Sequence, residues 1–164
     1  MIALALFGFS AASFAQATAS ATATATIIAP ITITNLQDMN FGNAAVAGAG
    51  TVSLDPDGLR IPTGGITLPV VTGTVAAAAF AVTGEGNSTY SITLPSGNYT
   101  ITRLTGSETM TVNNFVSSPS VVAGGTLSDG SQNITVGATL NVNSGQVPGV
   151  YTNATGFDVT VNYN

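Results

Sequence analysis

The sequence contains no cysteine, histidine, lysine or tryptophan, and its only cationic side chains are Arg60 and Arg103. Charged residues make up 5% of the 164-residue chain, and seven carboxylates give a net charge of −5. Because nucleic-acid binding depends on cations that neutralise phosphates, we expect no nucleic-acid partner. The usual transition-metal ligands, the commonest general base and the thiol nucleophile are also missing. We therefore predict a protein that is not an enzyme and has no metal or cofactor.

The first residues have the composition of an export leader. An apolar stretch, residues 2–9, is followed by small residues and by two small-x-small cleavage sites, which end at Ala17 and Ala15. We favour Ala17, so that residues 1–17 are a signal peptide. A buried N-terminal strand or helix is the alternative. The leader predicts export to an extracellular or outer-surface location, which agrees with the low charge and the missing lysine. No apolar run approaches the roughly 20 residues of a membrane-spanning helix, so we expect no transmembrane segment in the mature chain.

Residues 18–30 alternate strictly between two kinds of side chain. Alanine occupies the odd positions of residues 18–26, threonine or serine occupies the even ones, and isoleucines continue the odd face beyond them. This period of two is typical of a β-strand, while Pro30 indicates an edge or a bend. The Ala/Thr segment would bury little apolar surface. We expect an N-terminal arm or edge strand that presents Ala21, Ala23, Ala25 and Ile27 on one face.

The remainder, residues 31–164, reads as short strands separated by turn residues. The predicted strands are Met39–Gly42, Thr51–Leu54, Ile66–Thr72, Ala76–Gly84, Thr89–Leu94, Tyr99–Arg103, Met110–Val116, Ile134–Val142 and a last strand from Phe157. The Asn113-Asn114 pair suggests a bulge, and "DPDG" after Leu54 predicts a turn with Gly58 at positive φ. No helical period stands out beyond the leader. The pattern predicts a single antiparallel β-sandwich domain.

The last strand has large apolar residues at every second position: Phe157, Val159, Val161 and Tyr163. Exposed edge strands carry unpaired backbone groups, and proteins usually protect them with lysine, proline or a bulge. This strand has neither lysine nor proline. Either a segment of the same chain covers it and the domain is monomeric, or a neighbouring subunit or chaperone adds a strand to it.

Three stretches, "ITITNLQDMNFGN", "FAVTGEGNSTYSITLP" and "GVYTNATGFDVTVNYN", carry a resemblance to a known family. They resemble a family of bacterial secreted domains of unknown function, akin to spore-coat-U-like and fimbrial pilin domains of Gram-negative bacteria. The resemblance implies an exported, immunoglobulin-like (pilin-like) β-sandwich with Greek-key connections. Pilins of the chaperone–usher kind have an incomplete sheet, which a chaperone and then the arm of the next subunit fill. Their final strand has the alternation and penultimate aromatic seen from Phe157 to Tyr163.

The acidic residues suggest two other functions, calcium binding and glycoside hydrolysis. Asp55 and Asp57 could bind calcium through their oxygens, although a β-turn also needs these residues. Glu85 and Glu108 are the only glutamates, and a glycosidase needs two carboxylates across a substrate cleft. Both glutamates lie in or beside Gly-rich turns. Few aromatic residues are available to stack on a sugar.

We expect an exported structural protein, a pilin-like or coat-like subunit that assembles through strand edges into a homo-oligomer or filament, with a periplasmic chaperone and an outer-membrane usher as partners. The alternative is a monomeric cell-surface adhesin or glycan-binding module. The residues expected at the partner edge are Phe157, Val159, Val161 and Tyr163 of the last strand and Ala21, Ala23, Ala25 and Ile27 of the arm.

Overall fold

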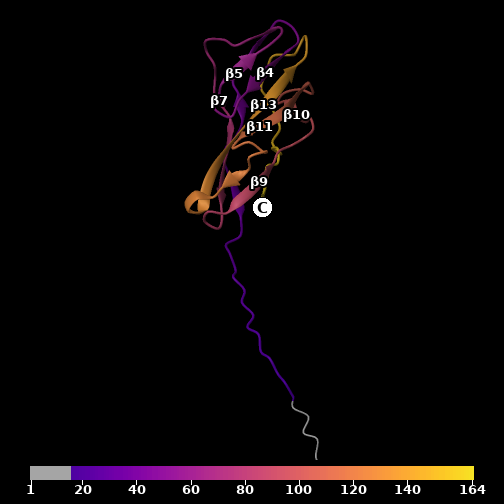
Figure 1. Cartoon of the computed structure of the whole chain (residues 1–164). Coiled ribbons are helices and arrows are strands. Elements are labelled where there is room, and N and C mark those ends of the chain that lie inside the picture. Colours follow the sequence, from indigo (N-terminus) through magenta and orange to yellow (C-terminus); the bar gives the residue numbers. More distant parts are fainter. Residues whose placement is uncertain (1–15) are drawn as a thin grey trace, which may run out of the picture.

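The computed structural model describes residues 16–164, which form an antiparallel all-β protein with an extended N-terminal segment (Figure 1). The largest sheet curls into a half-barrel, and the described residues contain no α-helix, only the 3₁₀ turn η1, Ser128–Gly130. The all-β antiparallel prediction is confirmed. The immunoglobulin-like sandwich with Greek-key connections stays a prediction. Residues 1–15, most of the expected signal peptide, lie outside the described residues.

The eight-stranded main sheet is built on one long strand, β13, Ser131–Val142. One edge of β13 pairs with β11, while its other edge pairs first with β8 and then with β4. The order is β1-β8-β13-β11-β10-β14, with β5 beyond β4. The bounds are β1 Thr32–Gln37, β4 Gly50–Leu54, β5 Arg60–Pro62, β8 Ala78–Thr83, β10 Tyr99–Arg103, β11 Thr109–Ser118 and β14 Tyr151–Thr152.

A three-stranded sheet, β12-β9-β15, lies at the lower end of the domain in Figure 1, where β9 is labelled. Two short strand pairs, β2 with β7 and β3 with β6, complete the structure. The bounds are β2 Asn40–Phe41, β3 Ala45–Val46, β6 Ile66–Thr67, β7 Val75–Ala76, β9 Thr89–Thr93, β12 Gly125–Thr126 and β15 Thr160–Tyr163.

The core has two parts along the length of β13. The lower part packs β8 and the first half of β13 against β9 and β15, through Phe80, Val82, Tyr90, Ile92, Ile134, Val136 and Val161 among others. The upper part surrounds the second half of β13, through Val52, Ile66, Val112, Ala138, Leu140 and Val142. The predicted alternation of β13 is thus buried on one face throughout its length, which connects the two parts.

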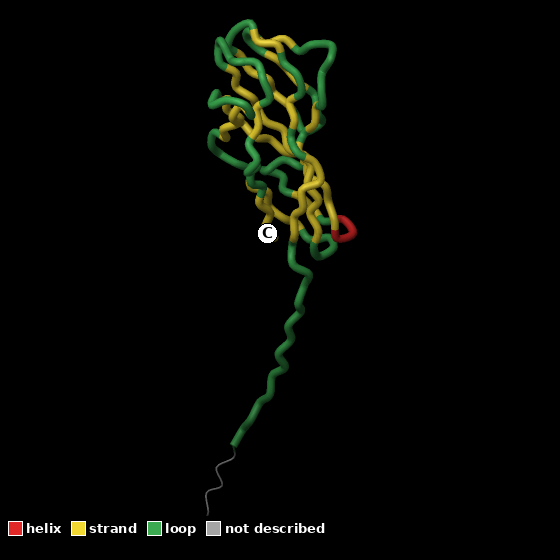
Figure 2. Tube along the Cα trace, turned by 180° about the vertical axis from the view of Figure 1, so that it is seen from behind, coloured by secondary structure: helices red, strands yellow, loops and turns green. Residues whose placement is uncertain are grey.

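Three segments differ clearly from the strands expected from sequence. Of Ile66–Thr72, only Ile66–Thr67 forms a strand, β6. The Ala/Thr alternation of residues 18–26 forms no strand in this chain, because no neighbouring strand lies beside it; the first strand begins at Thr32 (Figure 2). The last strand begins at Thr160, not Phe157, because Phe157 leaves the strand line to pack against Phe80 and Phe115. The predicted bulge is confirmed by a register shift between Asn113 and Val116.

Candidate functional site

The first and last strands of the domain, β1 and β15, lie at sheet ends. β1 is the first strand of the main sheet and β15 is the last strand of the order β12-β9-β15. Within residues 16–164, β1 pairs with β8 only and β15 with β9 only. Each of these strands therefore has one edge without a strand partner among the described residues.

The unpaired edge of β15 carries the backbone groups of its apolar residues. The Asn164 N–H donates to the Thr89 carbonyl at 3.2 Å, and backbone groups of successive residues point to opposite sides of a strand. Asn162 and Thr160 therefore face β9, like Asn164. The N–H and C=O groups of Val161 and Tyr163 point away from β9.

The same geometry applies to β1. The Gly84 N–H donates to the Gly130 carbonyl at 3.0 Å, so the even residues of β8 face β13 and the odd ones face β1. Thr32 and Thr34 pair with Thr83 and Ala81 and use their backbone groups there. The backbone groups of Ile33 consequently point away from β8, toward the free edge of β1.

The two edge strands lie close to each other, since some Cα atoms of β1 and β15 are within 8 Å. Half-buried side chains beside them pack against the lower core: Ile31, Ile33 and Met39 on the β1 side, and Phe157, Val159 and Tyr163 on the β15 side. Above them a cavity of about 860 Å³ lies between β2 and the segment of residues 146–157, and Met39 and Phe157 are the members of this set that line it. Its walls include Ala78, Phe80, Val112 and Val142, so the apolar core is reached from this side. We call this cavity the groove.

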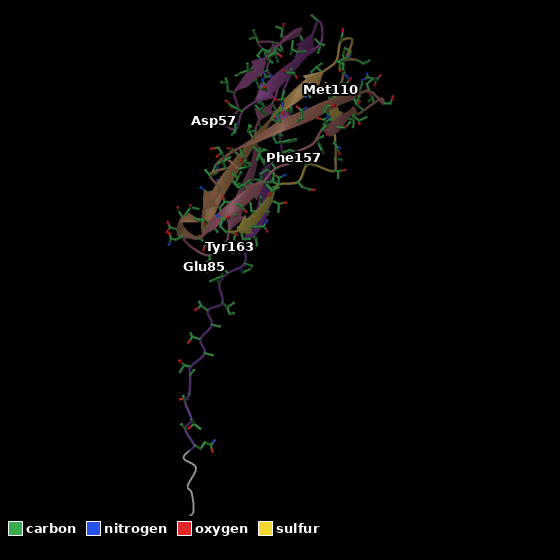
Figure 3. All side chains as sticks on the ribbon, turned by 45° about the vertical axis from the view of Figure 1, so that its right-hand side comes forward. Asp57, Glu85, Met110, Phe157 and Tyr163 are labelled. Atoms are coloured by element: carbon green, nitrogen blue, oxygen red, sulfur yellow. The ribbon has the colours of Figure 1, made fainter. Side chains whose placement is uncertain are left out.

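Phe157 lies near the middle of the domain, between Met110 and Tyr163 in Figure 3, and lines the groove. Its ring lies 4.9 Å from Phe115, 6.1 Å from Tyr99 and 6.4 Å from Phe80, measured between centroids, and the last two contacts are edge-to-face. The Tyr99 hydroxyl is buried. Burial raises the pKa of Tyr99, a hydrogen bond with the Gly156 backbone lowers it, and the nearby charge of Asp158 raises it.

The arm, residues 16–30, extends away from the lower end of the domain (Figure 1). All its side chains are exposed, including the expected partner residues Ala21, Ala23 and Ala25, and Ile27 is 92% exposed. Of the expected edge residues, Phe157 lines the groove, Val161 is part of the lower core, and Val159 and Tyr163 pack against that core. The expected arm residues lie outside the groove.

The base of the arm is held by two residues that sequence reasoning did not place there. The Ala29 N–H donates to Glu85 Oε2 at 3.1 Å, and the Tyr163 hydroxyl donates to the Ala29 carbonyl at 2.9 Å. Glu85 lies 56 positions from Ala29 in sequence, and no local signal connects them. Ile31 and Ile33, by contrast, were visible as a continuation of the apolar alternation.

The acidic residues do not gather. Glu85 holds Ala29 at the lower end, whereas Glu108 makes an ion pair with Arg103 at 3.5 Å, close to Met110 at the other end (Figure 3). The Asp55 carboxylate accepts the Asp57 and Leu59 N–H groups at 3.0 and 2.8 Å, which shapes the predicted turn. The residues 16–164 contain no group of three or more potential metal-ligating side chains.

Comparison with known families gives one match. The family described as Domain of unknown function (DUF4402) matches residues 31–163. The matched range includes β1, β15 and all residues that line the groove, and it excludes the arm. No curated protein and no solved structure matches the chain.

Proposed function

The chain belongs to the DUF4402 family, and we propose that it is an exported structural subunit that assembles at the cell surface by donating its arm to the groove of a second copy. The observation that carries this proposal is the pair of edges on β1 and β15 that have no strand partner among the described residues and lie below a groove that reaches the core. An added strand would satisfy backbone groups on both edges and cover the groove in a single step.

The arm has the length and the pattern that such a strand needs. Residues 18–30 span about 40 Å when extended at roughly 3.3 Å per residue, while β1 has only six residues. The arm can therefore reach from its own domain into another one. Its odd face is alanine up to Ala25 and isoleucine at Ile27, so small side chains would enter the groove and threonines would face solvent.

The immunoglobulin-like sandwich predicted from sequence would form only when two copies assemble. In the single chain the β12-β9-β15 sheet and the main sheet have no shared strand. We infer that a donated strand beside the free edges of β1 and β15 completes an immunoglobulin-like, pilin-like sandwich. The spore-coat and fimbrial resemblance expected from sequence is part of this proposal, and so are the extracellular or outer-surface location and the Gram-negative origin.

An open apolar groove is a hazard before assembly, because unpaired edges invite non-specific association. We infer that a periplasmic chaperone covers it first and that an outer-membrane usher directs the exchange. Any extended segment can pair with the free backbone groups of the two edges. A strand of a chaperone could therefore bind there as well as an arm.

The wide upper end of the groove favours a second candidate, a monomeric glycan-binding adhesin. Tyr99 and Tyr151 line this region together with Asn153, which supplies an amide. Aromatic rings and amides are suitable groups for sugar recognition. In this case glycans would bind the groove and the arm would have no role in association.

The test compares the full chain with a variant that lacks residues 18–26. We expect oligomers or filaments from the full chain in light scattering and electron microscopy, and monomers from the variant. A peptide of residues 18–28 should bind the variant, and the same peptide with lysine at positions 21, 23 and 25 should not. Equal association of both proteins, or a full chain that stays monomeric at high concentration, would refute the proposal.

A further inference from the structure

Three hydrogen bonds hold the base of the arm in one direction. Glu85 Oε2 accepts the Ala29 N–H at 3.1 Å, the Tyr163 hydroxyl donates to the Ala29 carbonyl at 2.9 Å, and the Glu85 N–H donates to the Tyr163 oxygen at 2.5 Å. We call this arrangement the Ala29 clasp. Both backbone groups of one arm residue are thus bound by side chains of the domain. Figure 3 shows Glu85 and Tyr163 together where the arm leaves.

The end of β8 leaves room for the clasp. A Cβ atom at Gly84 would collide with the Tyr163 hydroxyl and lie 3.0 Å from Leu127, which is fully buried. The clasp therefore depends on a glycine beside Glu85. Tyr163 itself is set by its pairing with Tyr90 in β9, so its hydroxyl is positioned by the core.

The position of the clasp creates a competition between two outcomes. Tyr163 belongs to β15, and Ala29 lies three residues before β1, so the arm leaves the domain beside these two edge strands and below its own groove. A tethered segment has an effective concentration in the millimolar range, well above that of a second chain. An arm free to turn back would therefore fill its own groove, and the chain would be a closed monomer.

We propose that Glu85 and Tyr163 are positioning residues that direct the arm away from its own groove, so that only the groove of a second copy can receive it. This inference rests on the proposed function, since it assumes that the groove binds an arm. Turning back would require a change of backbone direction at Ala29, and the clasp binds the N–H and C=O groups that would have to be released for it.

The absence of cysteine makes the direction of the arm measurable. We would place Ala21→Cys in the arm and Ala154→Cys on the exposed wall of the groove, in the full chain, and treat the protein with a short bismaleimide. A denaturing gel then separates products joined within one chain from ladders joined between chains. With the clasp intact, we expect ladders to dominate.

In this background, Tyr163→Phe and Glu85→Ala should each raise the ratio of intrachain to interchain product by about fivefold, since each removes at least one hydrogen bond to Ala29. Glu85→Gln keeps an acceptor oxygen and should leave the ratio unchanged. A thermal melt checks that each variant is folded, and Glu85 lies in a loop, so its variants do not depend on the core.

The outcomes separate the two proposals. Ladders with an unchanged ratio in both Tyr163→Phe and Glu85→Ala would overturn the clasp and leave arm donation standing. Intrachain product alone in the protein with an intact clasp would overturn both, because the arm would then fill its own groove. Absence of any product in that protein would overturn arm donation and the clasp with it.

Discussion

At the scale of single residues, the buried hydroxyls and the tight glycines of the core have the clearest consequences. Tyr90 is fully buried, and its hydroxyl donates to Gln132 Oε1 at 2.8 Å. The same oxygen accepts the Thr126 N–H at 2.9 Å, so one amide connects β9, β12 and β13. Burial raises the pKa of Tyr90 above its ordinary value of 10.0.

Tyr90→Phe should lower the free energy of unfolding by about 1 kcal/mol at neutral pH, because it removes one buried hydrogen bond. The pH dependence follows from the raised pKa. Below pH 10 the tyrosine is protonated in both states; above it the unfolded chain releases the proton first, so stability falls as pH rises. Denaturant unfolding between pH 7 and 11 should show that the free energy of unfolding falls less with pH in the variant. An equally steep fall in both proteins would contradict a raised pKa for Tyr90.

Gly137→Ala should lower the free energy of unfolding by roughly 1–3 kcal/mol, since there is no room for a side chain. Gly137 lies where β13 changes partner from β8 to β4, and an added Cβ would collide with the Leu54 carbonyl and the backbone of Asp55. Gly97→Ala is the matched control, because nothing lies within 4 Å of its added Cβ. Thermal denaturation of both variants measures the difference. Equal melting temperatures would show that the backbone at Gly137 yields without cost.

At the scale of elements, the arm and the two edge strands depend on each other under the proposed function. The arm has a strand pattern and no neighbouring strand within its own chain, and β1 and β15 have edges without partners among the described residues. Strand pairing has a period of two, so the two faces of the arm should differ sharply in their tolerance to charge.

Ala23→Lys should prevent arm binding, because position 23 belongs to the face that enters the groove and an unpaired ammonium group is costly to bury. Thr24→Lys, one position away, should retain association, because that face stays in solvent. Light scattering of the two variants at equal concentration measures the difference. Equal loss in both, or loss in Thr24→Lys alone, would contradict the proposed face of the arm.

At the scale of the whole molecule, charge opposes assembly. Each copy has a net charge of −5, with two arginines, of which Arg103 is paired with Glu108. The Arg60 guanidinium donates to the carbonyl of Phe41 at 2.6 Å and to that of Asn43 at 2.9 Å. Within residues 16–164 no helix has the length and apolarity needed to cross a membrane. Under the proposed function, backbone pairing and apolar contact have to outweigh the repulsion between copies of like charge.

Association of the full chain should be faster at 0.15 M salt than at 0.01 M, since the Debye length falls from roughly 30 Å to 8 Å and copies of like charge then repel less. The time course of light scattering at the two ionic strengths measures this effect. The variant that lacks residues 18–26 is the control and should show little association at either. Slower association at the higher salt would mean that attraction between opposite charges drives contact instead.

Much of the β architecture was readable from local pattern. The alternation of β9, β10 and β13 predicted strands at the correct positions, because period two reports which face is buried. The turn after Leu54 is also confirmed: Gly58 has φ 86 and its N–H donates to the Asp55 carbonyl at 3.0 Å. The alternation predicted that the last strand begins at Phe157, and this was wrong. Phe157 is as apolar as Val159 and Val161, but its ring packs against Phe115, and β15 begins only at Thr160.

The sequence by itself determined an antiparallel β protein without basic surface, in which the first and last apolar alternations are well marked. Only the tertiary structure decided that β1 and β15 are both edge strands beside one groove, that the arm lies outside it, and that Glu85 and Tyr163 meet at Ala29. Alternation reports the buried face of a strand, but its pairing partner is set by contacts far apart in the chain, such as the 134 positions between Ala29 and Tyr163.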